Sequence, residues 1–157
     1  MQVFLSTIAG KIDAKGRVLI PASFRNVAIA QGFSGIYLYP SFTKKIIEGG
    51  GQVLIDHFSQ SISNIDPFEE GSDELALALL GRSQKLGFDG DGRITLPQEL
   101  LTHAEIKQDL YFVGLGAKFQ IWQQQAFDVY RKTASEKALK HRGLLRALSA
   151  PPKETKT

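Results

Sequence analysis

A nine-residue motif occurs twice in this chain, and this repetition limits the possible folds more than any other feature. The motif reads Asp-x-x-Gly-Arg, an aliphatic residue, any residue, a second aliphatic residue and Pro. It occupies residues 13–21 and recurs 76 positions later at residues 89–97. Similar apolar segments follow both copies, so the sequence predicts two copies of strand, tight turn, strand, short helix and strand.

The residue types of the motif predict its local structure. An Asp at the start of a turn accepts backbone N–H bonds, and a Gly three positions later supplies the positive φ that closes the turn. A Pro after the second strand has its φ set for the first turn of a helix. We therefore expect hairpin tips at 13–16 and 89–92, and an Asp–Arg ion pair in each. The identical pairs are Asp13/Asp89, Gly16/Gly92, Arg17/Arg93 and Pro21/Pro97, and the aliphatic pairs are Val18/Ile94 and Ile20/Leu96.

Each copy alone is too small for an independent core. With about 50 ordered residues a unit buries too little apolar surface to fold by itself, so the two halves should interlock. The chain has 157 residues and no cysteine, which excludes disulfides, thiolate zinc sites and a cysteine nucleophile. Open strand edges and an apolar helix face predict that copies of the chain associate with one another.

The sequence predicts five segments. A capping box at Asp66–Glu69 and an apolar helix at Asp73–Leu80 are expected between the repeats, and Gly49–Gly51 is expected to be a flexible connection. The segments are repeat 1 (3–55), a linker with a short helix (56–81), repeat 2 (82–125), a C-terminal amphipathic helix (126–149) and a flexible tail (150–157).

Charge is distributed unevenly along the chain. The net charge of +3 divides into +3 for residues 1–60, −6 for residues 61–128 and +6 for residues 129–157. Basic side chains gather at the first turn, and exposed Lys and Arg neutralise phosphates and bind guanine edges. The candidate DNA contacts from charge are Lys11, Lys15, Arg17 and Arg25.

Catalytic and metal-binding patterns are weak. His57, His103 and His141 lie far apart without ligand spacing, and no serine stands in a G-x-S-x-G elbow, so we expect no enzyme and no cofactor. Residues 87–98 match part of an EF-hand register through Asp89 and Asp91, but Gly87 and Gln98 stand where two carboxylate ligands are needed. Calcium binding is therefore a minor alternative.

The tandem D-x-x-G-R-[VI]-x-[IL]-P motifs, the Phe-Leu-Ser start, Phe-Val-Gly-Leu-Gly, Phe-Gln-Ile-Trp and the basic end resemble the MraZ family of bacterial transcriptional regulators. The resemblance covers about residues 3–148. It implies an α+β, mainly β fold of two interlocked AbrB-like (SpoVT-AbrB) β-barrel repeats. It also implies ring-shaped homo-oligomers that bind short direct repeats in the promoter of the division and cell-wall gene cluster, usually as repressors.

The resemblance also assigns DNA-binding positions. It carries the Asp-x-x-x-Arg role to Asp13, Arg17, Asp89 and Arg93. In the second copy Asp91 stands where the first has Lys15, so unequal DNA contact by the two copies is expected.

The expected partners are double-stranded DNA and further copies of the chain, with no small-molecule substrate and no membrane. No apolar stretch is long enough to span a bilayer and no secretory signal begins the chain, so a cytoplasmic, nucleoid-associated protein is expected. The alternative function is an AbrB-like protein-interaction module of the antitoxin type, which would have a disordered C-terminal segment.

Overall fold

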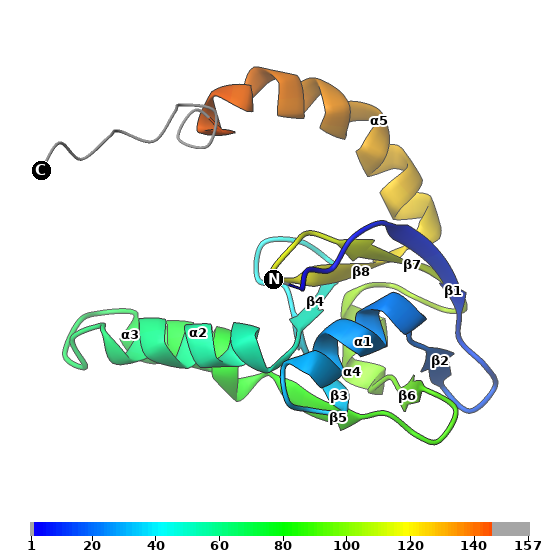
Figure 1. Ribbon diagram of the computed structural model, residues 1–157. Helices are drawn as coiled ribbons and strands as arrows, with labels where there is room; N and C mark the ends of the chain where they lie inside the picture. Colours follow the sequence, from blue (N-terminus) through cyan, green and yellow to red (C-terminus); the bar gives the residue numbers. More distant parts are fainter. Residues whose placement is uncertain (1, 146–157) are drawn as a thin grey trace, which may run out of the picture. The chain divides into compact units, whose positions relative to one another are not determined.

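The computed structural model describes residues 2–145, which divide after Gln124 into two compact units. The strands of the first unit form two antiparallel sheets (Figure 1). In chain order the strands are β1 (Thr7–Lys11), β2 (Arg17–Leu19), β3 (Gly35–Pro40), β4 (Ile47–Gly50), β5 (Gln84–Gly87), β6 (Arg93–Thr95), β7 (Asp109–Gly114) and β8 (Phe119–Gln123).

The larger sheet has the order β1-β7-β8-β4-β3-β5, and the smaller sheet pairs β2 with β6. The first strand of each copy therefore lies at the edge of the other copy's part of the sheet: β1 pairs with β7, and β5 pairs with β3. The expectation that the halves interlock is confirmed. The assignment of 3–55 and 82–125 as separate repeats stays a prediction.

The two hairpin tips differ from the expectation in their strand partners. A tight turn joins β1 to β2, but these strands pair with β7 and β6 instead of with each other. The same exchange occurs at the second turn. The exchange lets short strands from both copies cover one core, which neither copy can build alone.

The α+β class is confirmed, with antiparallel sheets and short helices. The strands of the described chain do not close into a barrel, because β1 and β5 stand at opposite edges of the larger sheet. The fold thus has an open six-stranded sheet and a separate two-stranded sheet, so the expected β-barrel is not closed within residues 2–145.

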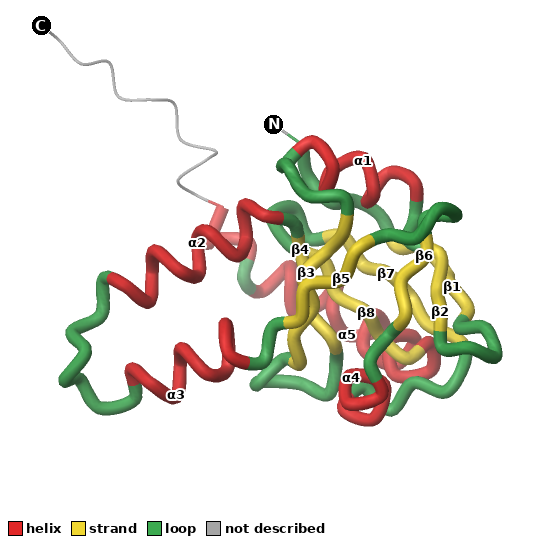
Figure 2. Tube along the Cα trace, turned by 90° about the horizontal axis from the view of Figure 1, so that it is seen from below, coloured by secondary structure: helices red, strands yellow, loops and turns green. Residues whose placement is uncertain are grey.

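Two short helices begin directly after the motif prolines, as predicted. Helix α1 (Ala22–Ala30) follows Pro21 and α4 (Gln98–His103) follows Pro97. They lie on opposite sides of the strands (Figure 2).

The core between these helices and strands draws on both copies. The ring of Phe24 on α1 lies 5.2 Å from the ring of Phe4, 5.3 Å from that of Phe119 and 6.1 Å from that of Phe112, measured between centroids. All four rings are at most 1% exposed.

The segment between the repeats is more helical than expected. Helix α2 (Gln52–Ser63) is followed by α3 (Ser72–Ala76) and a π-helical turn (Leu77–Gly81), and α2 runs beside α3 away from the strands (Figures 1 and 2). The helix expected at 73–80 is confirmed. The flexible connection at Gly49–Gly51 is wrong, because Gly49 and Gly50 belong to β4 and Gly51 precedes α2. A Cβ at Gly49 would lie 2.5 Å from the Leu38 side chain, so close packing requires glycine there.

The capping box at Asp66–Glu69 is also wrong. The Asp66 side chain accepts the backbone N–H of Phe68 at 2.9 Å, which closes a local turn in place of a helix start. Gly71 adopts φ +89° and ends this loop, and α3 begins at the next residue.

The described part of the helix predicted at 126–149 is α5 (Gln124–Lys140), which starts at the last residue of the first unit and is followed by a 3₁₀ turn at Arg142–Leu145. Leu148 and the predicted tail at 150–157 lie outside the described residues. Among residues 2–145 no helix is long and apolar enough to cross a membrane.

We expect Phe24→Ala to lower the free energy of unfolding by about 3–5 kcal/mol, because it empties a space lined by rings from both copies. Urea denaturation should show one transition for wild type and variant, since the copies share this core. Phe68→Ala is the matched control, because Phe68 is 95% exposed. Two separate transitions in the wild type would contradict a shared core.

Candidate nucleic-acid interface

The first turn is held by the carboxylate of Asp13. Its Oδ1 accepts the backbone N–H groups of Lys15 at 2.9 Å and Arg17 at 2.8 Å, and its Oδ2 accepts Arg17 Nε at 2.8 Å. Gly16 closes the turn with φ +79°. The predicted Asp13–Arg17 ion pair is confirmed, and Lys15 projects from the tip as an exposed side chain.

The second turn repeats the backbone geometry but changes the side-chain pairing. Asp89 Oδ1 accepts the backbone N–H groups of Asp91 and Arg93, both at 2.9 Å, and Gly92 also has φ +79°. The Arg93 guanidinium pairs with Asp91 at 3.8 Å, so the predicted Asp89–Arg93 side-chain pair is wrong. Asp91 offers Arg93 a second carboxylate at the position where the first turn has Lys15.

Each turn is fixed by the strand end of the other copy. The backbone N–H of Ile20 donates to the carbonyl of Gly92 at 3.1 Å, and that of Leu96 donates to the carbonyl of Gly16 at 2.9 Å. These bonds and the β2–β6 pairing bring the two motifs into one structural unit. The sequence indicated two similar turns, and the strand exchange joins them.

A backbone hydrogen bond has the largest effect on the pKa of each turn carboxyl. The backbone N–H of Arg17 has the largest effect on Asp13 and lowers the pKa of its carboxyl below the ordinary value, aided by the Arg17 side chain and the N–H of Lys15. The backbone N–H of Arg93 does the same for the pKa of Asp89, and the charge of Arg17 in the other turn also lowers it. Both carboxylates therefore stay ionised and keep their turns closed.

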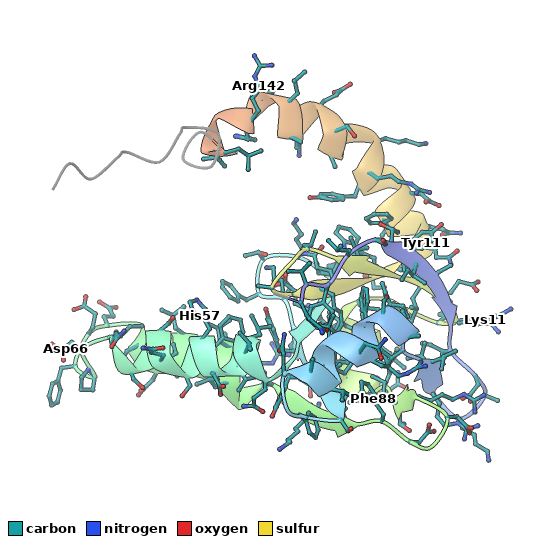
Figure 3. All side chains as sticks on the ribbon, viewed as in Figure 1. Lys11, His57, Asp66, Phe88, Tyr111 and Arg142 are labelled. Atoms are coloured by element: carbon teal, nitrogen blue, oxygen red, sulfur yellow. The ribbon has the colours of Figure 1, made fainter. Side chains whose placement is uncertain are left out.

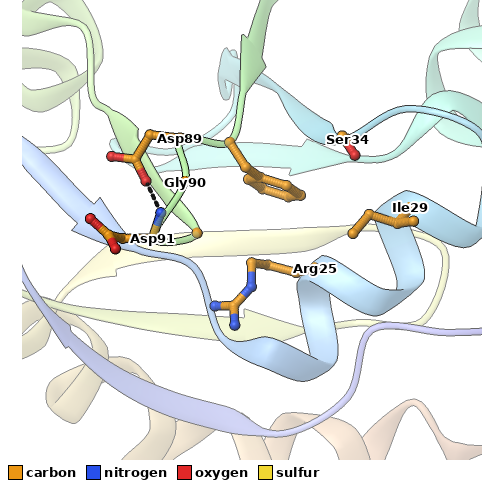
Figure 4. A pocket seen from close by; sticks show the side chains of 8 residues that line it. Arg25, Ile29, Ser34, Asp89, Gly90 and Asp91 are labelled. Carbon is orange, nitrogen blue, oxygen red and sulfur yellow. Dashed lines mark hydrogen bonds between the residues drawn. The ribbon is translucent and has the colours of Figure 1, made fainter.

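Arg25 lies on α1 beside the second turn, at a hollow of about 350 Å³ (Figure 4). Its Nη1 donates to the carbonyl of Ile20. The hollow is lined by Arg25, Ile29, Ser34, Phe88 and the turn residues Asp89–Gly92. Of the predicted basic contacts, Arg25 is thus the one engaged with the backbone next to the second turn.

Lys11 ends β1 opposite Asp109 of β7, and its side chain points outward (Figure 3). It is exposed, as Lys15 is, while Arg17 and Arg93 are half-buried. Five of the predicted residues lie at the two turns: Asp13, Lys15, Arg17, Asp89 and Arg93. Lys11 lies on β1, the strand before the first turn.

This arrangement presents arginine guanidinium groups and a lysine ammonium group on turns held by hydrogen bonds. Such groups can contact phosphates and base edges. It does not gather metal ligands: residues 2–145 hold no group of three His, Cys, Asp or Glu side chains placed for an ion. The Asp89 carboxylate faces backbone N–H donors, which disfavours the calcium alternative. The Asp91–Arg93 pair was missed from the sequence, although the acidic residue at position 91 was its signal.

Stability should depend on pH through the two turn carboxylates. A carboxyl with a lower pKa in the folded than in the unfolded chain stabilises the fold above its unfolded pKa, and this contribution is lost as the pH falls. The Tm advantage of the wild type over an Asp13→Asn/Asp89→Asn double variant should therefore be present at pH 6. It should shrink as the pH falls through about 4 and below. Glu70→Gln, in the exposed loop before α3, is the control. An advantage that is equal at both ends of this range would contradict the assignment.

Comparison with known proteins gives concordant results. Residues 79–147 match the model of the family described as "MraZ protein, putative antitoxin-like". A protein of Pelagibacter ubique named "Transcriptional regulator MraZ" is 45% identical over 92% of this chain and 93% of its own length. Proteins of the same name from Parvibaculum lavamentivorans and Xanthobacter autotrophicus are 40% and 36% identical. The first alignment covers 96% of this chain and 94% of the relative, and the second covers 99% of both.

The alignments with these relatives extend over nearly the whole chain, so they span both copies of the turn motif. Their shared name is that of a regulator of transcription, so the family is one of regulators and not of enzymes. With this identity over this length, the chain belongs to the MraZ family of transcriptional regulators.

Proposed function

We propose that this protein represses transcription by binding double-stranded DNA in a sequence-specific manner. The DNA would bind at the two turns, residues 13–16 and 89–92. The observation that carries the proposal is the pair of carboxylate-braced turns, which present Lys15, Arg17 and Arg93 at fixed positions. Asp13 and Asp89 orient the turns, while the basic side chains contact DNA.

Charge supports this division of roles. A duplex attracts basic groups through its phosphates and is recognised by the donors that reach its base edges. Arg17 is held at Nε by Asp13 and is still 33% exposed, which leaves the outer part of its guanidinium for a phosphate or a guanine. Lys11, exposed on β1, adds a further phosphate contact.

The proposed target is a set of short direct repeats in the promoter of the division and cell-wall gene cluster, and the proposed assembly is a ring-shaped homo-oligomer. Repeated sites suit a ring, because the second subunit binds its repeat at a high effective concentration once the first is bound. Under this proposal the protein acts in the cytoplasm, associated with the nucleoid.

A protein-interaction module of the antitoxin type is the second candidate, because the matched family is described as "putative antitoxin-like". Such a module would bind a protein through a disordered C-terminal segment. In this chain α5 is helical from Gln124 to Lys140, which favours DNA binding.

We expect Arg17→Ala to weaken binding more than Arg93→Ala. Arg17 acts beside Lys15, whereas Arg93 pairs with the acidic Asp91. The measurement is a mobility-shift titration at fixed salt with a duplex from upstream of the protein's own gene. Arg82→Ala, outside both turns and paired with Glu99, is the control. Equal losses for the two turn variants would refute the asymmetry.

Light scattering on the purified chain should give a mass several times 17.3 kDa. DNA affinity should fall steeply with salt, with a slope of about −0.9 in log K against log salt for each phosphate contact. A monomer without DNA affinity would refute the proposed function, and salt-independent capture of a protein partner would favour the second candidate.

A further inference from the structure

Arg25 belongs to the first copy of the repeat but packs against the turn of the second. A Cβ built on Gly92 would lie 2.8 Å from both Cζ and Nε of Arg25 and 2.9 Å from its Cδ. The end of the arginine side chain therefore covers the Gly92 backbone at the space that a side chain would need.

The same arginine also bonds to the strand end that fixes this turn. Its Nη1 donates to the carbonyl of Ile20, whose N–H donates to the carbonyl of Gly92 at 3.1 Å. Arg25 thus bonds to Ile20 and lies against Gly92, the two residues that one backbone hydrogen bond joins.

The first turn has no equivalent of this side chain. The repeat offset places Leu101 at the position that corresponds to Arg25, and Leu101 is buried, 8% exposed. A Cβ on Gly16 would meet nothing within 4 Å, although Gly16 has the same φ of +79° as Gly92. The backbone bond from Leu96 to Gly16 is kept, so the two glycines differ in whether a side chain covers them.

The surroundings of Arg25 are unfavourable for a phosphate. Asp89 and Asp91 line the same hollow as Arg25, so a phosphate in this hollow would also face acidic side chains (Figure 4). The negative charges of these carboxylates oppose the binding of a phosphate.

We propose that Arg25 is a positioning residue that locks the second turn, and that it does not contact DNA itself. Its planar guanidinium covers Gly92 while one N–H holds Ile20, a combination that a lysine ammonium cannot supply. The second turn is thereby presented as a fixed element, while the first is held by its backbone bonds and Asp13. The effect on DNA rests on the proposed function, whereas the contact with Gly92 can be tested without DNA.

The first test measures Tm for the matched variants Gly92→Ala and Gly16→Ala. Both put an Ala at φ +79°, so both carry the same backbone strain, but only the first collides with Arg25. We expect Gly92→Ala to lower Tm by at least about 3 °C more than Gly16→Ala. In an Arg25→Ala background this excess should disappear, because there is no guanidinium to displace. Equal Tm losses in the wild-type background, or an excess that persists without Arg25, would overturn the proposal.

The second test measures binding of the upstream duplex over a salt series, well below the Tm of each variant. Arg25→Ala and Arg25→Lys should both weaken binding by about tenfold, because a second turn that is no longer held in place must be ordered when DNA binds. The salt slope should stay that of the wild type. A slope reduced by about 0.9 in Arg25→Ala, with near wild-type binding by Arg25→Lys, would identify a phosphate contact and overturn the proposal.

The proposed function and the positioning role of Arg25 can be refuted independently of each other. If the wild type binds no DNA, the proposed function fails and the Gly92 and Gly16 comparison still decides whether Arg25 holds the turn. If the wild type and the Arg25 variants bind DNA equally tightly, the result supports the proposed function and refutes the positioning role of Arg25.

Discussion

The exchange of strand ends between the two copies is the constraint on which the rest of the structure depends. Ile20 bonds to Gly92, Leu96 bonds to Gly16, and β2 pairs with β6, so neither motif is complete without the other. The exchange lets short strands share one core of Phe rings, and it places both turns on one structural unit. The two short helices begin directly after Pro21 and Pro97, close to the ends of the exchanged strands.

Joining two copies in one chain allows their turns to differ. A pair of identical subunits would have to carry the same residue at equivalent positions of both turns. Here Lys15 corresponds to Asp91, and Arg25 corresponds to Leu101. The first turn is cationic at its tip and open at Gly16, whereas the second has an Asp91–Arg93 pair and is covered by Arg25. The shared motif fixes the backbone, and these substitutions give each turn its own charge and rigidity.

Local chemistry predicted much of this fold from sequence. The turns, the positive φ at Gly16 and Gly92, the helices after Pro21 and Pro97 and the Asp13–Arg17 pair depend on residues a few positions apart. The strand partners could not be predicted that way, because β1 pairs with β7 across about a hundred residues. Helix α2 was missed because Gly49–Gly51 indicated a loop, whereas close packing against Leu38 requires glycine in β4. The position of Arg25 against Gly92 depends on the same long-range exchange.

The pairing of β1 with β7 also has a consequence for synthesis of the chain. Thr7 lies opposite Val113, so the N-terminal strand has no partner until most of the polypeptide has left the ribosome. At ordinary elongation rates of about 5–20 residues per second, that interval lasts roughly 5–20 s. During this time the backbone groups of residues 7–11 that will bond to β7 are unpaired and accessible to chaperones.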